Sequence, residues 1–239
     1  MWPITLKIAR YKPGEARRVD TFQVSIDPER TILDAVEKVW AEQDRSLVFR
    51  HACHHASCGS CAMVVNGVEV LPCIKLIKSV TQPNGVLAIE PLHNFPVIAD
   101  LVADMGPFFE RMLIAGMPIV GAADPLPGQE ADNFNRFDNC IECGACLSAC
   151  PVVATDSGYL GPAALAAAYH QLSASGKGLS KQAWESVDGE HGLWRCHATF
   201  ECSAVCPSNV DPAGKIMALR RRMTVEHIRQ MLGLGSRSE

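Results

Sequence analysis

The sequence of 239 residues lacks the long hydrophobic run that a membrane-spanning helix requires. Its longest uninterrupted apolar stretch, from Met112 to Ala123, has 12 residues and contains Pro118, whereas a helical span needs about 20 residues. The N-terminus, Met1 to Lys7, has neither the charged and apolar segments of a signal peptide nor the Arg- and Ser-rich composition of a transit peptide. We therefore expect a chain that reaches a membrane only through partner chains.

Sequence motifs for binding a substrate are also missing. There is no Gly-rich dinucleotide-binding fingerprint and no nucleophile elbow. The net charge of −4 gives no general nucleic-acid signal, but residues 215–239 hold six basic and two acidic residues, a local charge of +4. This basic stretch favours an anionic partner or a membrane surface, with a solvated helix face as the alternative. Apolar residues make up 48% of the chain, enough for one large core or two modest ones.

What the chain does have is eleven cysteines. An odd number of cysteines clustered at metal-ligand spacings argues against a secreted disulfide framework and for a reducing compartment. The spacings divide the cysteines into three groups, and no cysteine is left over. Zinc-binding and redox-sensor interpretations would leave some of the thiols unexplained.

The first group has the spacing of plant-type [2Fe–2S] ferredoxins. It consists of Cys53, Cys58, Cys61 and Cys73. A tetrahedral zinc site is one alternative, and the neighbouring histidines raise a Rieske centre as another. All four cysteines are present, so we expect the histidines to tune or shield the cluster. The small residues of the loop leave room for the cluster, and their N–H groups can point at the sulfur atoms: Ala56, Ser57, Gly59, Ser60 and Ala62. The histidines are His51, His54 and His55.

The second group has the spacing of bacterial-type ferredoxins, C-x2-C-x2-C-x3-C-P. It runs from Cys140 through Cys143 and Cys146 to Cys150, which precedes Pro151. In such a run the fourth cysteine ligates the other cluster of a pair. We therefore assign the first three thiols, completed by the distant cysteine that precedes Pro207, to a [4Fe–4S] cluster. The completing ligand is Cys206.

The third group is short of one ligand. Cys150 joins Cys196 and Cys202, and the position where a symmetric motif would place a fourth cysteine holds Thr199. Three thiolates predict a [3Fe–4S] cluster, because a threonine hydroxyl is a poor iron ligand at neutral pH. A [4Fe–4S] cluster with a non-cysteine fourth ligand is the alternative. Three clusters in one chain form an electron-transfer path that needs a donor and an acceptor on other chains.

Around these loops the pattern changes from strands to helices. Alternating residues predict strands at 4–11 and 21–26, Thr31 predicts the cap of a helix over 32–40, and Asn66-Gly67 predicts a hairpin turn. Together with the first cysteine loop they predict a ferredoxin-like unit of roughly a hundred residues. Residues 118–129 are expected to be part of a linker or loop. Helices are predicted from 161 and from Pro212.

The order of these motifs resembles the iron–sulfur subunit of succinate dehydrogenase and fumarate reductase, complex II, over nearly the whole chain. The resemblance implies an α+β chain with a β-grasp [2Fe–2S] ferredoxin domain at 1–105. A helical domain of bacterial ferredoxin type, with the [4Fe–4S] and [3Fe–4S] clusters, then follows at 106–239. The motifs are Cys58-Gly-Ser-Cys-Ala-Met63, Pro96 to Val102, Cys140 to Pro151, Gly161 to Leu165, and Cys196 to Pro207.

The resemblance also implies partners and a direction of electron flow. Electrons would pass from the FAD of a flavoprotein subunit through the three clusters to a quinone at a membrane anchor, with or without haem b on that anchor. The complex would lie at the cytoplasmic face of a bacterial inner membrane. By similarity, Pro151, His197 and Thr199 lie near the quinone head group.

Two positions depart from members of the family that use ubiquinone. Those members usually carry serine and tryptophan where this chain has Val152 and Thr155, so we expect menaquinone. A quinol:fumarate reductase working in the reverse direction, and a soluble iron–sulfur subunit of another dehydrogenase, are the alternatives.

Overall fold

The computed structural model describes residues 1–117, 139–174 and 179–233. The described residues form two compact units, the first made of residues 1–105 together with 141–149 and the second of the remainder. The predicted linker at 118–129 lies outside the described residues.

The first unit is built on a five-stranded mixed sheet with strand order β2-β1-β5-β3-β4. β1 pairs antiparallel with β2, from Trp2 opposite Ile26 to Arg10 opposite Arg18, and parallel with β5. Alternate side chains of β1 are buried, as the period-two pattern predicts. The strands are β1 (Trp2–Arg10), β2 (Arg18–Ile26), β3 (Met63–Val65), β4 (Val68–Val70) and β5 (Val86–Glu90).

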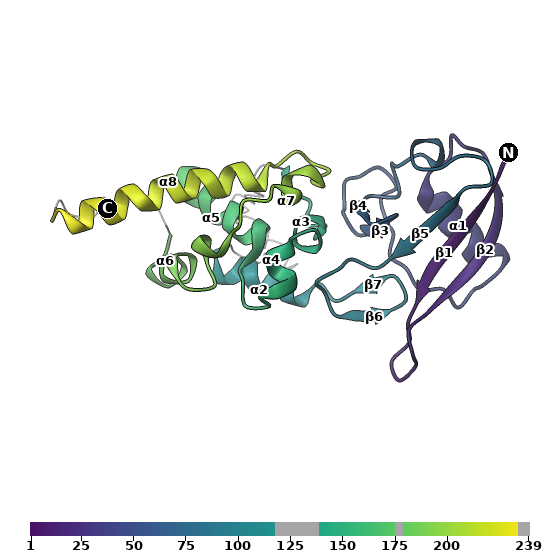
Figure 1. Ribbon diagram of the computed structural model, residues 1–239, viewed down its shortest axis with the longest axis horizontal. Coiled ribbons are helices and arrows are strands. Elements are labelled where there is room, and N and C mark those ends of the chain that lie inside the picture. The colour runs from purple at the N-terminus through teal and green to yellow at the C-terminus, as the bar shows by residue number, and fades with distance from the viewer. Residues whose placement is uncertain (118–138, 175–178, 234–239) are drawn as a thin grey trace, which may run out of the picture. The chain divides into compact units, whose positions relative to one another are not determined.

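One helix, α1 (Ile32–Glu42), packs its apolar side into the core of this sheet (Figure 1). Its predicted cap is confirmed: Thr31 Oγ1 accepts the N–H of Asp34 at 3.1 Å, and the Asp34 carboxylate accepts the N–H of Thr31 at 2.8 Å. The hairpin turn between β3 and β4 is also confirmed. Asn66 and Gly67 have φ values of 50° and 79°, the left-handed conformations that a two-residue turn of this type needs.

The second cysteine run is anchored to the first unit through a short helix, α3 (Ala145–Ser148). Ser148 Oγ accepts the N–H of His93 at 2.8 Å and donates to Glu69 at 2.7 Å. The Asn94 side chain donates to the carbonyls of Leu147 and Ser148. Ser148 and Glu69 are both buried, so these hydrogen bonds satisfy polar groups that would otherwise destabilise the unit. The unit also contains η1 (Ile77–Ser79), β6 (Val97–Ala99) and β7 (Val102–Ala103).

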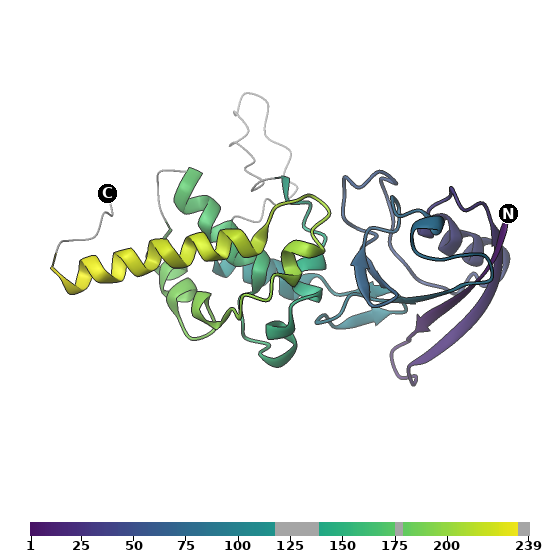
Figure 2. The ribbon, with the colours of Figure 1, turned by 45° about the horizontal axis from the view of Figure 1, so that its top comes forward.

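The second unit is helical, which confirms the predicted change of structure and with it the α+β class. α5 (Gly161–Ala174) packs against α8 (Pro212–Met231), as Figures 1 and 2 show. Its buried side chains include five alanines: Ala163, Ala164, Ala166, Ala167 and Ala168. Small side chains let the helix backbones approach closely. The other helices are α2 (Gly106–Ile114), α4 (Pro151–Thr155), α6 (Lys181–Asp188), η3 (Leu193–Arg195) and α7 (Glu201–Ala204).

Within the described residues, no helix is both long enough and apolar enough to cross a membrane.

Candidate iron–sulfur cluster sites

The first cysteine loop surrounds the Cys53 thiol with backbone donors. The N–H groups of His55, Ser57 and Cys58 point at Cys53 Sγ at 3.5, 3.3 and 3.4 Å. These donors, led by that of His55, lower the pKa of Cys53 to about 7. Among the small residues predicted to point an N–H group at a cysteine sulfur, Ser57 points one at Cys53. The donors from His55 and Cys58 were not predicted from the sequence. A thiolate held by three N–H groups suits an iron ligand.

The other three cysteines of the first group differ in exposure. Cys61 and Cys73 are buried and Cys58 is exposed. Burial raises the pKa of Cys61 to about 12, and the neighbouring Cys73 side chain contributes. The Cys58 side chain in turn contributes to the lowered pKa of Cys53. Cys58 also raises the pKa of Cys61, and protons on these thiols would have to be displaced when iron binds.

The loop also lies directly against the second cysteine run. A Cβ atom added to Gly59 would meet Cys143 Cβ at 2.8 Å and the carbonyl oxygen of Ile141 at 2.7 Å. Only glycine fits this approach, and its φ of +70° is left-handed as well. The first loop and Cys143 are therefore in contact within one unit, as a short electron path between two clusters would require.

The four predicted [4Fe–4S] ligands are divided between the two units. Cys143 and Cys146 lie in the first unit, and Cys140 and Cys206 lie in the second. Cys206 Sγ accepts the N–H of Val210 at 3.3 Å, a contact typical of a ligating sulfur. The four-cysteine set itself stays a prediction.

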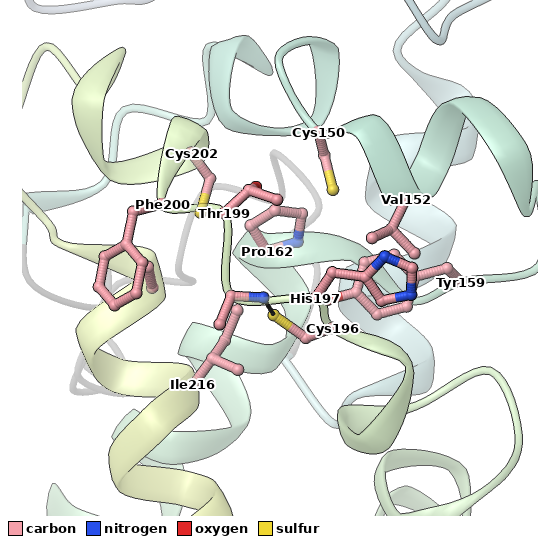
Figure 3. A pocket seen from close by; sticks show the side chains of 12 residues that line it. Cys150, Val152, Tyr159, Pro162, Cys196, His197, Thr199, Phe200, Cys202 and Ile216 are labelled. Carbon is pink, nitrogen blue, oxygen red and sulfur yellow. Dashed lines mark hydrogen bonds between the residues drawn. The ribbon is translucent and has the colours of Figure 1, made fainter.

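The third group comes together in one pocket of the second unit (Figure 3). Cys150 precedes α4, Cys196 follows η3 and Cys202 lies in α7. Burial raises the pKa of Cys202 to about 12, and the nearby Cys150 and Cys196 raise it further. Burial also raises the pKa of Cys150. The thiols of Cys150 and Cys202 are therefore costly to ionise in this apolar pocket, and cationic iron is the natural counter-charge.

Thr199 lines the same pocket, between Cys196 and Cys202 in the sequence (Figure 3). Its neighbours Ala198 and Phe200 have φ values of 56° and 65°, so the loop turns sharply on both sides of it. The predicted residue His197 also lines the pocket, whereas Pro151 begins α4 and is exposed. The complete lining is Cys150, Val152, Tyr159, Pro162, Cys196, His197, Ala198, Thr199, Phe200, Cys202, Ala213 and Ile216.

Two residues of this site were missed by the sequence reasoning. Tyr159 is 1% exposed, and burial and the surrounding cysteines raise its pKa; its hydroxyl interacts with Cys196. Arg220 on α8 donates to the carbonyls of Leu193 and Cys196. No spacing rule predicts either contact, because both join segments that are distant in the sequence.

Comparison with known proteins agrees with this arrangement of sites. Residues 5–110 match the family model described as a 2Fe-2S iron-sulfur cluster binding domain. Residues 136–210 match the model described as a 4Fe-4S dicluster domain. The predicted [2Fe–2S] and [4Fe–4S] clusters are therefore supported, and the [3Fe–4S] cluster stays a prediction.

Relatives extend the match to nearly the full chain. The fumarate reductase iron-sulfur subunit of Haemophilus influenzae is 32% identical over 96% of both chains. The succinate dehydrogenase iron-sulfur subunit of Paracoccus denitrificans is 33% identical over 90% of this chain and 86% of that protein. The solved structure of the Mycobacterium smegmatis Sdh1 complex in the apo form contains a chain that shares this fold, with a TM-score of 0.75 and 22% identity over 92% of this chain and 95% of that one. The chain belongs to the family of succinate dehydrogenase and fumarate reductase iron–sulfur subunits.

Proposed function

We propose that this chain is the electron-transfer subunit of a membrane-bound succinate:quinone oxidoreductase. The observation that carries the proposal is the pocket in which the thiols of Cys150, Cys196 and Cys202 meet Thr199, because a cluster with a vacant corner suits the end of an electron path. When bound, the clusters would carry single electrons from the FAD of a flavoprotein subunit to a quinone at a membrane anchor. The succinate site belongs to the flavoprotein.

The cluster ligands follow from the spacings, and the proposed domains are 1–105 and 106–239. Backbone donors around Cys53 would stabilise charge on a [2Fe–2S] cluster. The proposed sets are Cys53, Cys58, Cys61 and Cys73 for [2Fe–2S]; Cys140, Cys143, Cys146 and Cys206 for [4Fe–4S]; and Cys150, Cys196 and Cys202 for [3Fe–4S].

A quinone site next to the third group is part of the same proposal. His197 and Thr199 line the pocket of the three thiols, and Pro151 follows Cys150 at the start of α4. The buried Val152 brings no hydrogen-bond donor to this pocket, and Thr155 uses its hydroxyl on the carbonyl of Val152 at 3.1 Å. Menaquinone is the proposed acceptor, since Val152 and Thr155 replace the serine and the tryptophan that are usual in members that use ubiquinone. The proposed location is the cytoplasmic face of a bacterial inner membrane.

Low-temperature EPR of the purified complex tests the cluster assignment. The oxidised complex should show the signal of a [3Fe–4S] cluster, and the dithionite-reduced complex that of a [2Fe–2S] cluster. A complex that has full iron and sulfide but no oxidised-state signal would contradict the three-thiol assignment. Succinate oxidation with menaquinone and ubiquinone analogues tests the acceptor, and a clear preference for ubiquinone would overturn that part.

The direction of catalysis is a separate question. A fumarate reductase working from quinol would use the same ligands, because direction depends on the potentials of the clusters and the quinone. Comparing the rates of succinate oxidation and quinol-driven fumarate reduction in the same preparation distinguishes the two. Co-purification with a flavoprotein but no membrane chain would instead favour a soluble iron–sulfur subunit of another dehydrogenase.

A further inference from the structure

Beside the first cysteine loop, one carboxylate and two imidazole rings converge. Glu37 projects from α1, and His51 and His54 lie on the segment that carries Cys53. His51 Nδ1 is 3.3 Å and His54 Nε2 is 3.5 Å from Glu37 Oε1, and the two ring nitrogens are 3.0 Å apart. None of these side chains belongs to a predicted iron-ligand set.

The spacing of the three atoms matches one metal ion. Bonds of about 2.0–2.2 Å from zinc to nitrogen or carboxylate oxygen place two ligands of a tetrahedron about 3.3–3.5 Å apart. The observed separations of 3.0, 3.3 and 3.5 Å surround that value. Side-chain shifts of a few tenths of an ångström would complete the geometry.

Hydrogen bonding alone explains the cluster less well. The His51 and His54 nitrogens face each other, so one proton between them satisfies both. Glu37 Oε1 is then left over: it is shielded from solvent, and no described residue makes a hydrogen bond to it. A shielded carboxylate oxygen without a donor is unfavourable, whereas a shared cation would satisfy all three atoms.

The surroundings hold the three groups in place. The His51 ring stacks on Phe49 with centroids 5.2 Å apart and planes 21° apart, and Phe49 packs against the core of the sheet. His54 has a φ of 59°, a left-handed conformation at which the chain turns. The rings of His51 and His54 meet edge to face at 5.1 Å. Pre-positioned donors on a rigid frame are what a metal site needs.

The outer side of this group is open. The side chains of His51 and His54 are 41% and 46% exposed, so an ion can enter from solvent and keep water as its fourth ligand. Two imidazoles and one carboxylate with an open position form a ligand set that zinc uses. Other first-row divalent ions that favour imidazole would compete.

We propose that Glu37, His51 and His54 form a binding site for a single divalent transition-metal ion, zinc by its ligand set. His54 is the neighbour of Cys53, whose sulfur lies in the candidate [2Fe–2S] site. A cation there adds positive charge beside the cluster. It therefore favours the reduced form, which carries one more electron, and raises the reduction potential.

Metal uptake tests the site, and it does not depend on the proposed catalytic function. The purified holo complex is equilibrated with Zn²⁺, and zinc, iron and sulfide are counted per chain. We expect one zinc above the background with no loss of iron. Glu37→Gln and His54→Asn should each weaken binding by about 10-fold or more, since even losses of outer-shell partners cost 10–100-fold. The control Glu42→Gln lies on the same helix, pairs with Lys38, and should bind zinc like the wild type.

Two results would overturn the site: equal zinc uptake by the wild type and Glu37→Gln, or uptake that is matched by loss of iron. The second readout is the midpoint potential of the [2Fe–2S] cluster, measured with and without zinc. An upward shift is expected in the wild type and in Glu42→Gln but not in Glu37→Gln. A wild type that binds zinc with no change of potential would overturn the electrostatic effect. Co²⁺ in place of zinc should broaden the reduced [2Fe–2S] EPR signal, because the two paramagnets would be close.

Discussion

Gly59 touches Cys143 so closely that a Cβ atom on the glycine would lie 2.8 Å from the Cβ of the cysteine. Gly59→Ala should therefore separate the first cysteine loop from the segment that carries Cys143. Its left-handed φ of +70° adds a further cost of about 1–2 kcal/mol. We expect a lower midpoint of thermal unfolding and less iron per chain. Both are measured on the purified complex.

Gly67→Ala is the matched control for this substitution. Gly67 has a φ of +79°, but nothing lies within 4 Å of the position its Cβ would take. This variant should show the conformational cost alone and keep its iron. Equal losses in the two variants would show that contact with Cys143 is unimportant.

Thr199 occupies the position at which a fourth thiol would complete the third group, and it lines the pocket with Cys196 and Cys202. Thr199→Cys should allow one additional iron per chain to bind. The oxidised-state EPR signal of the [3Fe–4S] cluster should then disappear. Thr199→Ala should keep both the signal and the iron content, because it adds no ligand. If Thr199→Cys kept the signal and its new thiol could be alkylated in the holo protein, Thr199 would not mark the vacant corner.

Arg10 is a buried cation that joins several segments of the first unit. Its side chain is 0% exposed, with Nη1 2.9 Å from Asp20 and 2.5 Å from Asp44, and Nε 3.1 Å from the buried Asp100. Arg10→Met would leave the Asp100 carboxylate without its counter-charge, which typically costs about 3–5 kcal/mol. A urea titration of the holo subunit should show this loss.

Two comparisons separate charge from packing at Arg10. The double variant Arg10→Met/Asp100→Asn should recover part of the stability, because it removes the uncompensated charge. Arg18→Met should change little, since Arg18 is 45% exposed in its pairs with Asp20 and Glu15. An Arg10→Met variant as stable as Arg18→Met would contradict the role of this buried cation.

Local sequence rules predicted the parts of this protein that depend on neighbours in the chain. The cap at Thr31, the turn at Asn66-Gly67 and the cysteine spacings each follow from residues a few positions apart. The approach of Gly59 to Cys143 and the contact of Tyr159 with Cys196 depend on how distant segments pack. Such contacts leave no periodicity in a single sequence, so only the folded chain reveals them.

The cluster-free subunit should show a strong difference in thiol reactivity between Cys53 and Cys202. The pKa of Cys53 is lowered to about 7 by backbone N–H groups, that of His55 first, and the pKa of Cys202 is raised to about 12 by burial. The thiolate is the reactive form, but its nucleophilicity falls as its pKa falls. At pH 7 the two effects together leave Cys53 faster by on the order of a hundred-fold. The difference should be visible in alkylation by iodoacetamide, followed by peptide mass spectrometry.

The pH dependence of the two rates gives the sign of each shift. Alkylation of Cys53 should level off above about pH 8, where most of its thiolate is formed, whereas alkylation of Cys202 should still rise about tenfold per pH unit at pH 9. In urea both thiols lose their surroundings and should react at similar rates with the ordinary cysteine pKa of about 8.5. Equal rates in the folded cluster-free subunit would mean that neither the donors around Cys53 nor the burial of Cys202 persists without iron. The cysteine loops would then form only when the clusters bind.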